Sequence, residues 1–153
     1  MSRIRITKEF NFEMAHALWN YDGLCRNIHG HSYKLFVTII GEPVNDNDNP
    51  NNGMLIDFSE MKTMIRTNVI DYYDHALVLF KNSPSELLNN VKQMFDKLHI
   101  VEFQPTCENL VFDIAKRILK KLPPDIKLYS VRLNETATAY AEWYSIDNEY
   151  LPE

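Results

Sequence analysis

The sequence predicts an α+β fold in which helices pack on one face of a four-stranded antiparallel sheet. Two stretches near the N-terminus alternate apolar and polar side chains, as half-buried strands do. The middle of the chain has helical spacing and helix-capping residues, and two further strand-like stretches close the chain. Strands followed by helices and then by strands favour an antiparallel sheet whose helices are segregated from it.

The first two strands are expected at 3–14 and 29–40, where side chains of alternating parity form two distinct faces. Residues 17–28 would connect them. This connection is too long for a tight hairpin, so Cys25 is expected on a loop.

The first helix is expected from about residue 58 to near Tyr73, after a polar turn at 45–53. Asp57 and Glu60 have the N-cap and N3 spacing of a capping box. Helical spacing predicts that one face of this helix is buried, formed by Phe58, Met61, Ile65, Val69 and Tyr72.

Two more helices are expected, at 83–98 and 105–122. Ser83 is the expected N-cap of the former, followed by a proline that suits the first helical position. Thr106 is the expected N-cap of the latter, and the prolines at 123–124 end it.

The closing strands are expected at 126–134 and 138–146. Neither a repeat nor a linker separates any of these elements. A chain of 153 residues is an ordinary length for one domain, so we expect a single domain over 1–153.

Composition excludes several classes of function. A net charge of −5 leaves no overall basic field for nucleic acid. The N-terminus lacks an apolar signal core, and no apolar run has the roughly 20 residues of a membrane helix. Two cysteines are too few for a disulfide framework, so we expect a cytoplasmic protein with reduced thiols.

Three histidines form a candidate metal site. His29 and His31 lie on one face of their strand, and His16 continues the apolar parity of the neighbouring strand. Single histidines usually make ordinary hydrogen bonds, but three that converge favour a metal ion. Zinc suits such a site and often keeps one position open for catalysis, although nickel, iron or copper could also bind.

Cys25, just before these histidines, has two interpretations. As a fourth ligand it would close a structural site, although structural zinc sites usually have two or more thiolates. As a free thiol beside a cation it could act as a base. Local chemistry leaves both open.

Three carboxylates and one further histidine are candidates for acid–base work or binding. Asp74 could orient His75 as a proton donor, although a solvated pair at a helix end is the simpler interpretation. Glu108 suits the first turn of its helix on dipole grounds alone. Glu135 continues the inward face of a strand, where a carboxylate either meets solvent or binds an N–H pair.

Six motifs in order resemble the 6-pyruvoyl-tetrahydropterin synthase / 6-carboxy-tetrahydropterin synthase family: "FEMAH" (12–16), "CRNIHGH" (25–31), "GMLIDFSEMK" (53–62), "DH" (74–75), "PTCEN" (105–109) and "NET" (134–136). The resemblance implies the T-fold, with trimers forming a barrel and two trimers stacked as a hexamer. The stretch between "DH" and "PT" then reads as a helical insertion at about 81–100.

The resemblance also implies residue roles. It implies zinc on His16, His29 and His31, and Cys25 as the base with Asp74 and His75 as its partners in proton transfer. It implies Glu135 as the anchor for the pterin, with Glu108 and Thr106 nearby, in sites that lie between subunits.

The C-x3-H-G-H spacing is similar to that of the bacterial queuosine-pathway enzymes of this family. The implied reaction converts 7,8-dihydroneopterin triphosphate to 6-carboxy-5,6,7,8-tetrahydropterin with release of acetaldehyde and triphosphate. One alternative is 6-pyruvoyl-tetrahydropterin synthesis, which eliminates triphosphate only. An alternative of another class is a non-catalytic protein that binds zinc or pterin, with a structural site of one cysteine and three histidines.

Overall fold

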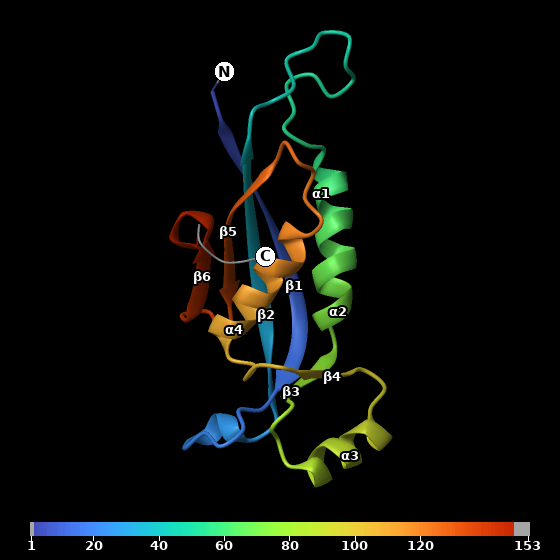
Figure 1. Cartoon of the computed structure of the whole chain (residues 1–153), viewed down its shortest axis with the longest axis vertical. Coiled ribbons are helices and arrows are strands. Elements are labelled where there is room, and N and C mark those ends of the chain that lie inside the picture. The colour runs from blue at the N-terminus through green and yellow to red at the C-terminus, as the bar shows by residue number, and fades with distance from the viewer. Residues whose placement is uncertain (1, 149–153) are drawn as a thin grey trace.

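The computed structural model describes residues 2–148. Its strands form one sheet in the order β4-β3-β1-β2-β5-β6 (Figure 1). The strands are β1 (Ile4–His16), β2 (His29–Gly41), β3 (Ala76–Phe80), β4 (Leu98–Val101), β5 (Lys127–Asn134) and β6 (Tyr140–Tyr144). The α-helices are α1 (Phe58–Ile65), α2 (Asp71–Tyr73), α3 (Ser85–Met94) and α4 (Cys107–Leu119), and shorter helical turns are η1 (Leu24–Arg26), η2 (Arg66–Ile70) and η3 (Ser145–Asn148).

The long antiparallel pair β1–β2 forms the centre of the sheet. Its register runs from Ile4 opposite Gly41 to His16 opposite His29. Alternation along both strands buries one face, on which Phe12 and Tyr33 stack with ring centroids 5.1 Å apart. The predicted strands at 3–14 and 29–40 are therefore confirmed, and so is the common face of the three histidines.

The prediction of four antiparallel strands was wrong, because the sheet has two more. β3 pairs in parallel with the end of β1, and β4 pairs in parallel with β3. β3 is almost wholly buried, so its sequence is a short apolar run without alternation. Such a run cannot be distinguished from part of a helix by periodicity.

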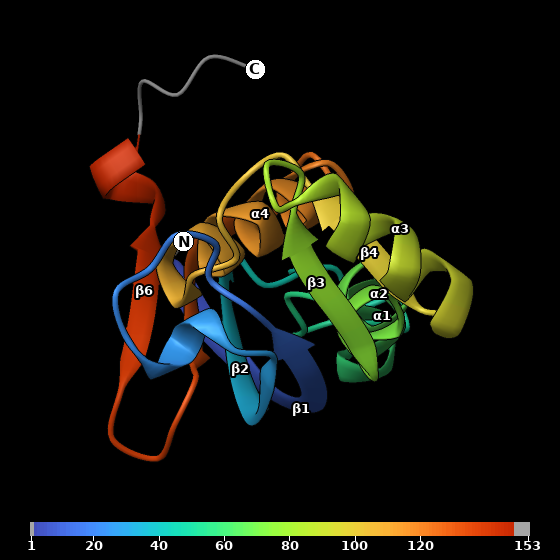
Figure 2. The ribbon, with the colours of Figure 1, turned by 90° about the horizontal axis from the view of Figure 1, so that it is seen from below.

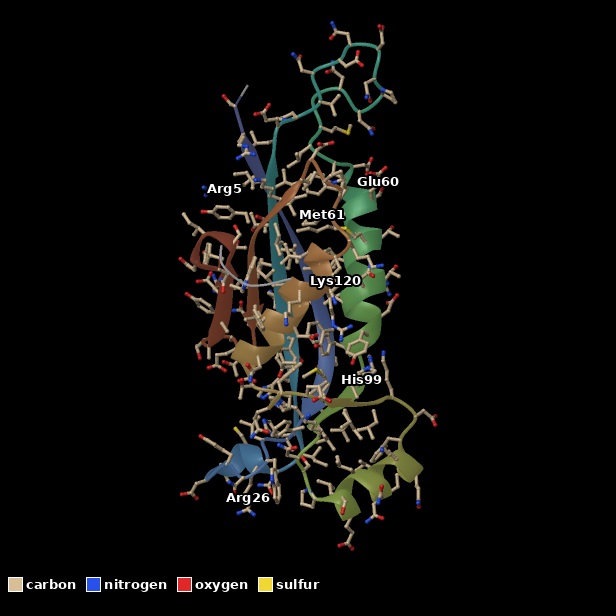
Figure 3. All side chains as sticks on the ribbon, viewed as in Figure 1. Arg5, Arg26, Glu60, Met61, His99 and Lys120 are labelled. Carbon is tan, nitrogen blue, oxygen red and sulfur yellow. The ribbon has the colours of Figure 1, made fainter. Side chains whose placement is uncertain are left out.

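Helices α1, α2 and α4 pack on one face of the sheet, which curls around them (Figures 1 and 2). Figure 3 shows the contrast along α1, where buried Met61 faces the core and exposed Glu60 faces outward. α3 covers a smaller second core with Leu88 and Val91 against Leu77 and Leu79. No helix within residues 2–148 has the length and apolar content to cross a membrane.

The helix that begins after Asp57 changes its pitch. Asp57 caps it by accepting from the Ser59 backbone N–H, as predicted. At η2 the chain makes a wider π-helical turn, which contains more residues than an α-turn. The buried face therefore advances by one position, so that Tyr73 is fully buried and the expected Tyr72 is only partly buried.

The helix predicted at 83–98 is shorter than expected. Pro84 occupies the N-cap position of α3 without a side-chain cap, so Ser83 does not cap the helix. The helix ends at Met94, and β4 follows. The last helix begins as predicted, because the Thr106 hydroxyl accepts from the Asn109 backbone N–H.

Candidate active site

The three histidines meet where β1 ends and β2 begins. One ring nitrogen from each of His16, His29 and His31 lies within 4.8 Å of the other two. His16 is 2% exposed, and its strand register places it directly opposite His29. The predicted cluster is thus present.

Backbone carbonyls orient two of these rings. The Nδ1 atom of His16 lies 2.6 Å from the Pro105 carbonyl oxygen, and the Nδ1 atom of His29 lies 2.7 Å from that of Asn27. A carbonyl oxygen only accepts, so each Nδ1 carries the proton and each Nε2 presents a lone pair. The two Nε2 atoms are 3.1 Å apart.

This arrangement fits a metal ion. The Nε2 atom of His31 is buried and has no hydrogen-bond partner among the described residues. Burial lowers the pKa of His16 below its ordinary value, which favours the neutral ring that a metal requires. Lone pairs that converge without a shared proton repel one another, and a cation between them removes that repulsion.

A pocket of about 290 Å³ opens beside His16. Most of the predicted site residues line this pocket, since its lining also includes Cys25, Thr106, Glu108 and Glu135. Cys25 lies in η1, in a loop held by the hydrogen bond from the Leu18 N–H to the Cys25 carbonyl, 2.9 Å. The group of side chains that could hold a metal ion consists of the three histidines, without Cys25.

Glu135 connects the pocket to the histidines. Its Oε1 lies 3.7 Å from Nε2 of His16 and 3.9 Å from Nε2 of His31. Oε1 also accepts a hydrogen bond of 3.3 Å from the hydroxyl of Tyr33. Burial and this carboxylate raise the pKa of Tyr33 well above its ordinary value, so the hydroxyl stays a donor.

Sequence reasoning missed three of these supporting groups. Pro105 and Asn27 act through backbone carbonyls, which leave no signature in side-chain type. Tyr33 had a detectable signal, because it shares the strand face of His29 and His31.

Cys107 also lines this pocket, where its surroundings favour the protonated thiol. Its Sγ donates to the Leu133 carbonyl at 3.3 Å. Burial, with the charge of Glu135, raises the pKa of Cys107 to about 11. It therefore stays protonated at neutral pH.

Asp74 and His75 contact each other through a bend after α2. Nδ1 of His75 lies 2.9 Å from Oδ2 of Asp74, and the backbone of His75 has φ 59°. Glu13 of β1 fixes the bend, because its N–H donates to the Asp74 carboxylate and its carbonyl accepts from the His75 N–H. Burial acts to raise the pKa of Asp74, but the Glu13 N–H and the His75 ring outweigh it and hold that pKa below its ordinary value.

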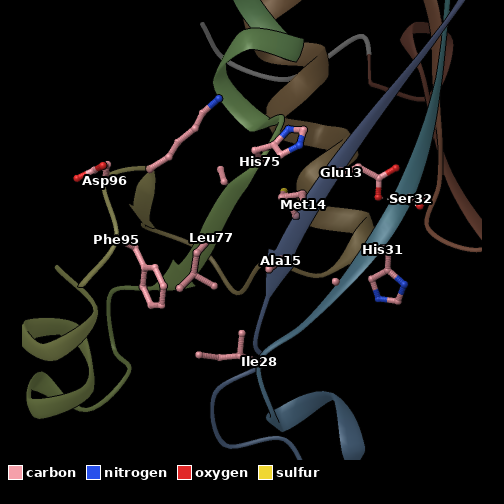
Figure 4. Close-up of a pocket in the computed structure, with 13 residues that line it drawn as sticks. Glu13, Met14, Ala15, Ile28, His31, Ser32, His75, Leu77, Phe95 and Asp96 are labelled. Atoms are coloured by element: carbon pink, nitrogen blue, oxygen red, sulfur yellow. Dashed lines mark hydrogen bonds between the residues drawn. The ribbon is translucent and has the colours of Figure 1, made fainter. Parts of the chain in front are cut away.

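The Asp74–His75 pair is separated from the pocket of Cys25. His75 is largely exposed and lines another pocket of about 650 Å³, together with Glu13, Phe95 and Lys97 (Figure 4). The two pockets share no lining residue. In Figure 4 the ring of His31 points away from His75, although both residues line this pocket. His31 also lines the pocket of His75 while His16 lines that of Cys25, so the histidine group borders both of these candidate half-sites.

By its fold and its histidine group, the chain is an α+β protein that could hold a metal ion beside a pocket of small-molecule size. The model of the 6-pyruvoyl tetrahydropterin synthase family matches residues 5–145, and the chain belongs to this family. It is therefore an enzyme of the tetrahydropterin synthase family, as its motifs indicated.

Relatives agree along nearly the whole chain. The chain is 35% identical over 143 residues to 6-carboxy-5,6,7,8-tetrahydropterin synthase of Haemophilus influenzae, covering 91% of this chain and 97% of the relative. It is 31% identical over 161 residues to the enzyme of the same name from Aquifex aeolicus, covering 90% and 96%.

Solved structures share the fold. An uncharacterized protein, WS1659 from Wolinella succinogenes, superimposes with a TM-score of 0.78 at 20% identity, covering 94% of this chain and 99% of that one. Caenorhabditis elegans 6-pyruvoyl tetrahydropterin synthase superimposes with a TM-score of 0.65 at 22% identity, covering 94% and 96%. The family's T-fold is thereby confirmed for the single chain, while the trimer and hexamer stay predictions.

Proposed function

We propose that this protein converts 7,8-dihydroneopterin triphosphate to 6-carboxy-5,6,7,8-tetrahydropterin, with zinc on His16, His29 and His31. Acetaldehyde and triphosphate are released and one water molecule is consumed. The observation that carries the proposal is the convergence of three ring nitrogens beside a pocket that holds a thiol and a carboxylate. The names of the Haemophilus influenzae and Aquifex aeolicus relatives support this product, and with it a role in queuosine biosynthesis.

Zinc in this position would supply Lewis acidity and a template for the hydroxyls of the substrate side chain. The chain's own residues divide the remaining work. Cys25, as a thiolate, takes a proton from the substrate side chain. His75, oriented through its contact with Asp74, returns a proton to the reacting system.

Glu135 anchors the pterin in this proposal. A carboxylate can accept two N–H bonds from the amino-pyrimidine edge of a pterin. Glu135 is 26% exposed and reaches from the histidines into the pocket. Thr106 and Glu108 line the same pocket at the start of α4 and bind substrate beside it.

The proposed site is completed by a second copy of the chain. The separation of the two half-sites supports this arrangement, since proton transfer requires the donor within hydrogen-bond reach of its acceptor. Trimers stacked as a hexamer would bring the Asp74–His75 pair of one subunit to the Cys25 pocket of another.

The second candidate function is 6-pyruvoyl-tetrahydropterin synthesis, in which triphosphate is eliminated and no acetaldehyde leaves. The matching family, that of 6-pyruvoyl tetrahydropterin synthase, favours it. Both reactions would use the same proposed residues, so product chemistry separates them.

The test is turnover of 7,8-dihydroneopterin triphosphate by the purified protein, followed by mass spectrometry of the products. We expect 6-carboxy-tetrahydropterin together with acetaldehyde. A pyruvoyl product without acetaldehyde would establish the second candidate instead. Binding of the substrate without turnover, by zinc-loaded protein, would favour the non-catalytic alternative.

A further inference from the structure

The last turn of α2 presents backbone carbonyls that have no helical partner. A helix end leaves its last carbonyls without intrahelical donors. α2 ends at Tyr73, and Asp74 already has an extended backbone with ψ 127°. The carbonyls of Asp71 and Tyr72 therefore need donors from outside the helix. The Asp74 carbonyl lies just beyond the helix, immediately before His75.

Side chains from the segment at β4 supply those donors. The Lys97 ammonium donates to the Asp71 carbonyl at 2.8 Å and to the Asp74 carbonyl at 2.5 Å. The Nε2 atom of His99 donates to the Tyr72 carbonyl at 2.7 Å. The His99 ring also stacks on Tyr72, with ring centroids 3.7 Å apart and an angle of 5° between the planes.

The backbone of the same segment holds the other end of the turn. The Leu77 N–H donates to the Lys97 carbonyl at 3.0 Å, and β3 continues in register beside β4. The Asp74–His75 turn thus lies between Glu13 of β1 on one side and Lys97 on the other. The positive φ of His75 is uncommon for a residue with a side chain, so surrounding contacts must maintain it.

We propose that Lys97 is a positioning residue for the Asp74–His75 pair, through its two hydrogen bonds to the carbonyls that end α2. The inference rests on the proposed function in so far as it concerns catalysis. Within residues 2–148, the hydrogen bonds of the Lys97 ammonium go to backbone carbonyls and not to a reacting side chain. It acts by fixing where the His75 ring emerges from the bend (Figure 4).

Three variants test the proposal. Lys97→Met keeps the length of the side chain but removes its donors. Lys97→Arg keeps a cation that can donate to both carbonyls. Lys92→Met is the matched control, because Lys92 is exposed on α3 and makes none of these contacts.

With 7,8-dihydroneopterin triphosphate as substrate, we expect Lys97→Met to lower kcat about 10- to 100-fold, since small displacements of a catalytic group have effects of this size. KM should change by less than about threefold, because the Lys97 ammonium is already bonded to two backbone carbonyls. Lys97→Arg should recover most of kcat, and Lys92→Met should leave both constants unchanged. Equal kcat values for Lys97→Met and the unmodified protein would overturn the proposal.

Amide hydrogen exchange gives a readout that does not need turnover. The amides of Asp74 and His75 bond to the Ile70 and Glu13 carbonyls, and both should exchange about tenfold faster in Lys97→Met than in the control. The Val37 amide in the central strands should not change. If the unmodified protein turns over no substrate, the proposed function fails, but the exchange test still applies. Unchanged exchange at Asp74 and His75 in Lys97→Met would refute the role of Lys97.

Discussion

At the scale of single residues, the chemistry of the site depends on which side-chain atoms are already bonded to other groups. The Nδ1 atoms of His16 and His29 are occupied by backbone carbonyls, so only Nε2 can face the common centre. Cys25 and Cys107 line one pocket, but burial keeps Cys107 a thiol. The neighbours of a side chain therefore set its chemistry, as the carbonyls beside His16 and His29 and the burial of Cys107 show.

Replacing Cys25 by alanine should lower kcat by about 10²- to 10⁴-fold, the usual effect of losing a general base. Metal content, measured by inductively coupled plasma mass spectrometry, should stay the same. Loss of the metal together with folding would instead support the structural site in which Cys25 is the fourth ligand.

Replacing His29 by alanine should release the metal, because two imidazoles on neighbouring strands bind it far more weakly than three. The comparison is metal content after dialysis against that of the unmodified protein. His99→Ala is a useful control, since His99 lies outside the three-histidine group. Full retention of metal by His29→Ala would be incompatible with the ligand assignment.

Cys107 should react slowly with a disulfide reagent at neutral pH. Its pKa is raised to about 11, so the reactive thiolate forms only as pH approaches that value. In a Cys25→Ala background, Cys107 is the remaining cysteine, and its labelling rate should rise steadily between pH 7 and pH 10. A fast, pH-independent reaction of the folded protein would contradict this environment.

At the scale of elements, the turn between α2 and β3 matters most. The π-helical turn at η2 and the bend at His75 connect the helix layer to the sheet. β3 then lies between β1 and β4, which is why its side chains are nearly all buried. The Asp74–His75 pair is positioned by these neighbours and not by its own sequence.

Leu79→Ala tests the burial of β3. Leu79 is fully buried in the second core, so its truncation should lower the free energy of unfolding by about 2–5 kcal/mol. Met94→Ala is the control, because Met94 is 69% exposed and should cost less than about 0.5 kcal/mol. Urea unfolding at one fixed protein concentration measures both. Equal effects would mean that β3 is not packed as described.

At the scale of the whole molecule, the two half-sites make assembly a requirement of the proposed reaction. Cys25 and Glu135 line one pocket, whereas His75 lines another. A subunit that lacks one half should therefore be rescued by a subunit that lacks the other.

Mixing two inactive variants tests this complementation. Cys25→Ala and His75→Ala subunits, unfolded together and refolded as mixed oligomers, should regain a measurable fraction of turnover. Each variant refolded alone should stay inactive. Failure of well-folded mixed oligomers to regain activity would show that one subunit supplies the whole site.

Sequence patterns were enough to predict the central features of the site and of the fold. Alternation along β1 and β2 placed His16, His29 and His31 on one face, because side chains of equal parity in a strand point the same way. The cap residues Asp57 and Thr106 predicted where two helices begin. Six motifs in order indicated the family.

Tertiary structure decided the rest. β3 could not be recognised from its short apolar run, because burial on both faces removes the alternation that identifies a strand. β4 has only four residues, too few to show a period. The carbonyls of Pro105 and Asn27 that orient the rings, and the Lys97 donors that hold the Asp74–His75 turn, come from distant or unpatterned positions. Their roles exist only once the fold brings a donor within reach of an unpaired acceptor.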